Sequence, residues 1–209
     1  MIENGATPQQ WSKLESMFEK RAEEIASVII QQIHLPNHLK SIKPSSTIGG
    51  LAGGSKYEYD GILFKIACDE HQIYGSDTLA SKGATNELRA IRSVRQCHIP
   101  FLHTTLSGLF YIHGYHVMAI ALAPIRGKHS LVYGSSDAGK TVHNKSESMR
   151  KYIEQLARNL NLKRHLVAQT TVEMDVAGDV EGHHSDIDGR LYLIDLARLF
   201  PPTVPKSGL

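Results

Sequence analysis

The sequence predicts an α+β fold in which antiparallel hairpins alternate with helices. Two observations support this class. Three segments carry apolar residues at helical spacing, and strand-like runs flank the turn dipeptides Asp60-Gly61, His113-Gly114 and Asp188-Gly189. The predicted order is helix, hairpin, helix, hairpin, helix, hairpin, with mostly antiparallel pairing. A two-lobed layout like that of protein kinases is a second arrangement with the same order of elements.

The first predicted helix covers residues 7–33. Thr7 can cap it, Pro8 suits its first position, and an apolar stripe runs from Trp11 to Ile33. A stretch rich in Pro, Ser and Gly follows at 43–54. We therefore expect an N-terminal amphipathic helix and linker over 1–40 and one domain over 41–209.

The remaining elements follow from turn, cap and proline signals. We expect a hairpin over 56–68, a helix over 77–97 and a second hairpin over 106–122. After a short strand at 130–133, a third helix has Asn144 as its expected cap with Glu147 three residues later. The last hairpin lies within 178–202.

Composition excludes several classes of protein. The 209 residues are 41% hydrophobic and 21% charged with a net charge of +2, which is typical of a globular protein and gives no strong sign of nucleic-acid or membrane binding. The two cysteines, Cys68 and Cys97, fit buried free thiols in a reducing compartment. Because no apolar run approaches the roughly 20 residues of a membrane span, we expect no such span and a cytoplasmic location.

Residues 134–141 match the phosphate-binding pattern G-x-x-x-x-G-K-[ST] in full. That motif works only where a helix begins at its Gly-Lys-Thr end, because the phosphates bind the amides of the helix amino terminus. Here the expected helix cap, Asn144, comes several residues too late. We therefore predict that Gly139-Lys140-Thr141 lies in a loop or strand.

A kinase-like interpretation competes with this one. Lys65 lies in an apolar strand, where kinases place the lysine that pairs with phosphate, and Glu87 lies on the following helix as its expected ion-pair partner. Asp179 would be the catalytic base, and His184 and Asp195 would bind Mg²⁺ beside ATP. Against this, His replaces Asn, the glycine spacing differs, and only 14 residues follow Asp195.

The segment 178–202 also invites a metal hypothesis. His183 and His184 are close to acidic residues such as Glu181, but adjacent residues of a strand point to opposite faces and cannot easily bind one ion. Asp195 follows four apolar residues, so we expect its carboxylate at the edge of the core. The polar side chains are otherwise expected to be hairpin residues.

Three arginines of the second helix, Arg89, Arg92 and Arg95, recur every three residues. Such a row could bind RNA phosphates. A solvated helix face is the common alternative. The sequence shows no aromatic-rich platform beside it for stacking bases.

Three blocks resemble the clustered-mitochondria (CLU) domain family. Residues 131–142 resemble its segment YGS-x-D-x-GKTV, residues 162–165 its LK-x-x-H, and residues 181–202 its ending EG-x-x-x-x-DGR-x-Y-x-LD-x-x-R-x-FPP. The resemblance spans roughly residues 56–202 in the family's order and accounts for the phosphate-binding pattern as a family loop.

The resemblance implies a binding or interaction module linked to mitochondrial distribution and to binding of mRNA, with a protein or RNA as partner. It supplies no catalytic residues and no certain cofactor. The enzyme alternative is a phosphotransferase, or a nucleotide-binding pseudokinase, that uses ATP and Mg²⁺.

Overall fold

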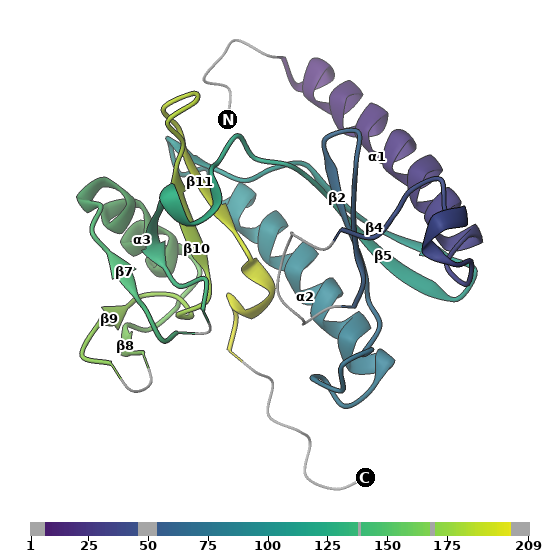
Figure 1. Cartoon of the computed structure of the whole chain (residues 1–209). Coiled ribbons are helices and arrows are strands. Elements are labelled where there is room, and N and C mark those ends of the chain that lie inside the picture. The colour runs from purple at the N-terminus through teal and green to yellow at the C-terminus, as the bar shows by residue number, and fades with distance from the viewer. Residues whose placement is uncertain (1–6, 46–53, 138, 168–169, 202–209) are drawn as a thin grey trace, which may run out of the picture. The chain divides into compact units, whose positions relative to one another are not determined.

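The computed structural model describes residues 7–45, 54–137, 139–167 and 170–201 (Figure 1). The chain forms two compact units. The first unit comprises residues 1–88 and 105–123, and the second unit comprises 89–104 and 124–209. Within the described ranges, none of the helices has the length and apolar character to cross a membrane.

The first unit contains a four-stranded antiparallel sheet in the order β1-β2-β5-β4. Its strands are β1 (Lys56–Tyr59), β2 (Ile62–Ile66), β4 (Ser107–Ile112) and β5 (Tyr115–Ala121). Both hairpins turn at the predicted dipeptides. Asp60-Gly61 and His113-Gly114 each place two residues at positive φ, the backbone that a tight two-residue hairpin turn requires.

Helix α1 (Pro8–Gln31) packs against β4 and β5 of this sheet. Thr7 and Gln10 form a capping box at its amino end, as the sequence predicts for Thr7. Its carboxyl-terminal half supplies Ala22, Ile25 and Ile29 to the core, while most of its amino-terminal half is exposed. A short 3₁₀ helix, η1 (Asn37–Leu39), follows. The prediction of a single domain over 41–209 stays a prediction.

Helix α2 (Asp77–Gln96) matches the predicted range and continues from the first unit into the second. Ser76 begins it, since its hydroxyl accepts a hydrogen bond from the Leu79 amide at 3.2 Å. Along one face it buries Ala80, Glu87 and, after the unit boundary, Ile91 and other apolar residues. A buried glutamate on an otherwise apolar face needs a partner.

The second unit has a five-stranded sheet in the order β3-β11-β10-β6-β7. The strands are β3 (Leu102–His103), β6 (Leu131–Gly134), β7 (His143–Asn144), β10 (Glu181–His184) and β11 (Leu191–Ile194). β3 runs parallel to β11, and the other pairs are antiparallel. The mixed α+β class with mainly antiparallel sheets is therefore confirmed.

Helix α3 (Glu147–Asn159) packs on β6 and fully buries Met149, Ile153 and Leu156. Its cap is Ser146, whose hydroxyl accepts from the Met149 amide at 3.2 Å. The prediction of Asn144 as cap is wrong because Asn144 still lies in β7. A small hairpin, β8 (His165–Leu166) with β9 (Glu173–Met174), and two 3₁₀ helices, η2 (Gly127–His129) and η3 (Leu196–Arg198), complete this unit.

Candidate functional site

The segment 134–141 does not form a phosphate-binding loop. No helix begins at Gly139-Lys140-Thr141, and α3 begins only at Glu147, so the prediction of a loop is confirmed. Asp137 organises the turn instead. Its carboxylate accepts from the Thr141 amide and the Ser135 hydroxyl, each at 2.8 Å. These bonds, the Thr141 amide first, lower the pKa of Asp137 to about 2.

Lys65 and Glu87 form the predicted ion pair in the first unit. The Lys65 ammonium lies 2.9 Å from one Glu87 oxygen and 3.2 Å from the other. The side chains are only 18% and 7% exposed. β2 and α2 thus hold a buried charged pair, which is confirmed as a structural feature, whereas its role in nucleotide binding stays a prediction.

Asp179 and His184, the predicted base and metal ligand, both lie in the second unit. Asp179 precedes β10 and pairs with Arg198 at 3.2 Å. His184 ends β10 and is exposed, while its neighbour His183 is 1% exposed, so the two imidazoles take opposite sides of the strand as predicted. His183 contacts the Ser130 hydroxyl and the Glu181 carboxylate, both at 3.0 Å, so a buried polar network engages both of its ring nitrogens.

The expectation that Asp195 lies at the edge of the core is wrong. Asp195 is exposed and has a φ of 54°, because the chain turns through the left-handed region directly after β11. The β10–β11 register pairs His184 with Leu191 and Glu181 with Ile194. His184 and Asp195 therefore lie at opposite ends of the hairpin, about 13 Å apart at about 3.3 Å per residue, too far to share one ion.

No group of three potential metal ligands occurs among the described His, Cys, Asp and Glu residues. The metal roles of His184 and Asp195 remain predictions without a common centre. The thiols of Cys68 and Cys97 are partly buried rather than fully buried, and burial raises the pKa of Cys68 to about 11.

The arginine row of α2 is partly engaged within the second unit. Arg89 lies over the Phe200 ring, 5.1 Å from its centroid, and the Arg95 guanidinium donates to the Thr104 hydroxyl at 3.1 Å. Arg92 is exposed. RNA binding by the row stays a prediction.

A cleft of about 210 Å³ opens beside the amino end of α3, and we call it the aromatic cleft. It is lined by Phe101, His103, Ser146, Ser148, Tyr152, His184, Gly189, Arg190 and Leu191. The rings of Phe101 and Tyr152 lie 6.2 Å apart, tilted by 38°. Phe101 is 58% exposed and has a φ of 64°, an uncommon backbone for a bulky residue.

The aromatic cleft brings together side chains that the sequence analysis did not group. Two rings, two imidazoles and the Arg190 guanidinium surround one hollow. The contributing residues come from β3, the α3 amino end and the β10–β11 hairpin, which are far apart in the sequence. No local pattern joins them, so sequence reasoning had no signal for them.

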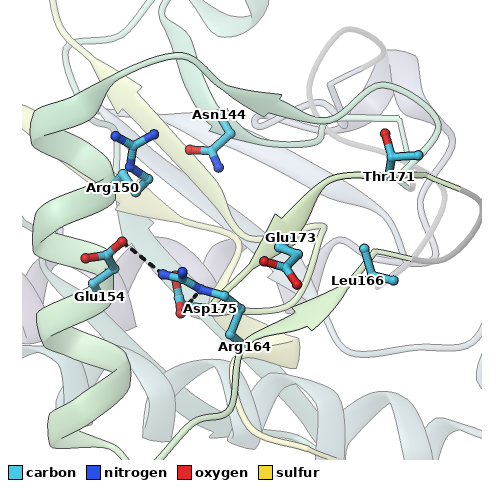
Figure 2. A pocket seen from close by; sticks show the side chains of 8 residues that line it. All are labelled: Asn144, Arg150, Glu154, Arg164, Leu166, Thr171, Glu173 and Asp175. Atoms are coloured by element: carbon cyan, nitrogen blue, oxygen red, sulfur yellow. Dashed lines mark hydrogen bonds and ion pairs between the residues drawn. The ribbon is translucent and has the colours of Figure 1, made fainter.

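A larger cavity of about 490 Å³, the charged cavity, lies on the other side of α3 (Figure 2). Its walls are Asn144, Arg150, Glu154, Arg164, Leu166, Thr171, Glu173 and Asp175. The Arg164 guanidinium donates to both oxygens of Asp175, at 2.9 and 3.0 Å, and to Glu154 at 2.9 Å. These carboxylates, Asp175 first, raise the pKa of Arg164 further above its usual value. Sequence analysis named none of these side chains as site residues.

Comparisons with known proteins identify the family. The model of the family described as "Clustered mitochondria" (CLU) matches residues 1–205. Similar proteins are each called "Clustered mitochondria protein homolog". The relative from Danio rerio is 32% identical over 157 residues, 69% of this chain and 11% of its own length. The one from Homo sapiens is 30% identical over 154 residues, 69% and 12% of the two chains.

The relative from Caenorhabditis elegans is 29% identical over 161 residues, 71% of this chain and 13% of its own. The chain thus spans about a tenth of the length of the curated relatives it matches. No solved structure matches it. With the family model covering nearly all of its residues, the chain belongs to the clustered mitochondria (CLU) family.

Proposed function

We propose that this chain is a non-catalytic binding module whose second unit binds single-stranded RNA at the aromatic cleft. The observation that carries the proposal is the pair of rings, Phe101 and Tyr152, beside Arg190, His103 and His184 in one hollow. Exposed rings stack on bases of any sequence, and nearby cations bind the phosphates between them.

The charge distribution supports an anionic partner for this unit. The second unit has 15 Lys and Arg against 10 Asp and Glu, a net charge of +5, whereas the first unit has 8 against 11, a net charge of −3. The overall charge of +2 hides this difference. An RNA strand would therefore meet a favourable field at the second unit only, with an affinity that falls as salt increases.

Fluorescence anisotropy with a labelled 12-nucleotide single-stranded RNA of mixed sequence tests the proposal. Phe101→Ala removes the exposed ring, and we expect a loss of affinity of about 5- to 150-fold, since stacking on one aromatic side chain contributes about 1–3 kcal/mol. Tyr111→Ala is the matched control, because Tyr111 is 70% exposed but lies in the first unit. RNA duplex of the same sequence should bind more weakly.

Two results would refute RNA binding at the aromatic cleft. The first is wild-type protein that does not bind the RNA at 50 mM salt. The second is equal affinity for wild type, Phe101→Ala and Arg190→Ala, because the strand would then bind elsewhere. In that second case, the RNA affinity of Arg92→Ala would show whether the arginine row of α2 binds the strand.

The second candidate function is nucleotide binding in a kinase-like arrangement, and the buried Lys65–Glu87 pair favours it. Asp179 would then be the base, and ATP with Mg²⁺ the cofactor. The melting temperature measured with ATP, ADP and GTP, with and without Mg²⁺, separates the two functions. The binding-module proposal expects no Mg²⁺-dependent rise, whereas a rise that Lys65→Met and Asp195→Asn both remove would support the pseudokinase.

The biological process is proposed from the family alone. We propose that the chain acts in the cytoplasm, with a protein or RNA partner, in the distribution of mitochondria, as the printed names of its relatives suggest. Imaging mitochondria in cells that lack the chain, and in cells that express Phe101→Ala in its place, tests this link. An unchanged mitochondrial distribution in both would contradict it.

A further inference from the structure

The charged cavity contains groups that are already bonded to each other and groups that are not. Arg164, Asp175 and Glu154 form a closed network on one wall (Figure 2). Asp175 is held further, since its backbone amide donates to the Tyr133 hydroxyl at 3.4 Å. This wall is pre-formed, so a ligand that binds here would not have to order it.

Three other groups in the charged cavity have no bonded partner. The side-chain oxygen of Asn144 is buried and makes no hydrogen bond. Arg150 and Glu173 are exposed, their side chains make no hydrogen bond or ion pair with another residue that the structure describes, and both line the same cavity. A buried acceptor that lacks a donor is unfavourable, so a ligand that supplies an N–H group to the Asn144 oxygen would be favoured.

The three groups together specify the chemistry of a ligand. Glu173 and the Asn144 oxygen favour a cationic donor, and Arg150 favours an anion, preferably a planar carboxylate that its guanidinium can bind through two hydrogen bonds. A cationic donor and an anion within one small molecule make a zwitterion. A volume of about 490 Å³ falls within the range of small-molecule sites and leaves space for a side chain.

Other ligand classes fit less well. The walls carry three carboxylates against two guanidiniums, which disfavours a polyanion such as a nucleotide. None of the described residues that line the cavity is aromatic, so a base has no ring to stack on there. Among the described residues the carboxylates do not form a metal-binding group. The cavity is also separate from the aromatic cleft, because Arg150 and Glu154 lie on the face of α3 opposite to Ser148 and Tyr152.

We propose that the charged cavity binds a small zwitterion, a free α-amino acid or a dipeptide. Glu173 and the Asn144 oxygen hold the ammonium group, and Arg150 holds the carboxylate. The Arg164 network forms the fixed wall behind the ligand. The site is independent of the RNA proposal, since it shares no residue with the aromatic cleft.

Isothermal titration calorimetry tests the site, after a thermal-shift screen of the 20 free amino acids and a set of dipeptides at 10 mM each. At least one should raise the melting temperature of the whole chain. For that compound, Arg150→Gln and Glu173→Gln should each lower the affinity by at least tenfold. Lys151→Gln is the matched control, because Lys151 neighbours Arg150 on α3 but pairs with Glu147 outside the cavity.

Chemical variants of the ligand check its orientation. The N-acetyl form removes the charge that Glu173 would meet, and the methyl ester removes the charge that Arg150 would meet, so each should lose most of the binding. The proposal is overturned if no amino acid or dipeptide shifts the melting temperature, or if Arg150→Gln and Glu173→Gln bind the compound as the wild type does. Unliganded melting temperatures of both variants establish that they fold.

Discussion

The ion pair of Lys65 and Glu87 tests how much the stability of this fold depends on pairing a buried carboxylate with a cation. The Glu87 side chain is 7% exposed and its oxygens lie 2.9 and 3.2 Å from the Lys65 ammonium. Lys65→Met keeps much of the length of the side chain and removes the charge. It leaves a buried carboxylate without its cation, which should lower the free energy of unfolding by about 3–5 kcal/mol.

The reverse change should cost less. Glu87→Gln leaves a lysine whose side chain is 18% exposed and can still reach water, and the amide oxygen keeps one hydrogen bond. We expect a loss of about 1–3 kcal/mol. The double variant Lys65→Met with Glu87→Leu removes both charges, and its stability should return to within about 1 kcal/mol of wild type, since apolar pairs often replace buried ion pairs without loss.

Urea unfolding of wild type, Lys65→Met, Glu87→Leu and the double variant Lys65→Met with Glu87→Leu, read as a double-mutant cycle, measures the coupling between the two side chains. A coupling energy above about 2 kcal/mol is expected. If Lys65→Met lowers stability by less than about 1 kcal/mol, then the Glu87 carboxylate is hydrated when the lysine is absent, and the argument from burial fails. Repeating the measurement with Mg²⁺-ATP distinguishes a structural ion pair from a nucleotide-binding site. Only at a nucleotide-binding site would the stability lost in Lys65→Met change when Mg²⁺-ATP is added.

Three further predictions concern single residues. Gly134→Ala should lower the free energy of unfolding by more than about 3 kcal/mol, because Gly134 has a φ of 89° and an added Cβ would overlap the Val180 carbonyl. Gly189→Ala is the comparison, since Gly189 has a φ of 73° but lies in open space, and it should cost only about 1–2 kcal/mol. Urea unfolding of both variants measures the difference. Asp137→Asn should flatten the pH dependence of stability. The wild-type carboxylate, with its pKa lowered to about 2, stabilises the fold above about pH 4 and loses that contribution as pH falls. The two proteins should therefore converge in melting temperature between about pH 4 and about pH 2. A constant difference across that range would contradict this sign. Asp195→Asn should change the free energy of unfolding by less than about 0.5 kcal/mol, because the residue is exposed and asparagine also adopts a φ near 54°. A loss of about 2 kcal/mol would instead show that the carboxylate stabilises the fold.

Local patterns were sufficient to predict the elements. Thr7 and the apolar stripe predict α1, and Asp60-Gly61 and His113-Gly114 predict two hairpins, because a two-residue turn needs positive φ that these residue types tolerate. The Lys65–Glu87 pair was also predictable, since an ammonium within an apolar strand must find a carboxylate. The late start of α3 correctly excluded the phosphate-binding loop.

Two predictions from the sequence were wrong, and both concern residues at the end of a strand. Asp195 follows four apolar residues, yet a left-handed turn directly after β11 places it in solvent, and nothing in the local pattern marks that turn. The cap of α3 was shifted from Asn144 to Ser146 because a two-residue strand, β7, pairs with β6 and extends the sheet to Asn144.

The sequence by itself determined the class of fold, the family and the position of most helices and hairpins, since these depend on spacing and turn chemistry within about 20 residues. Only the tertiary structure revealed the aromatic cleft and the charged cavity. Phe101 and Tyr152 meet because α3 and the segment around β3 pack in the same unit. Asn144 and Glu173 line one cavity because β7 and the β8–β9 hairpin border it. Contacts between residues so far apart in the chain depend on how whole elements pack, and a single sequence carries no local record of them.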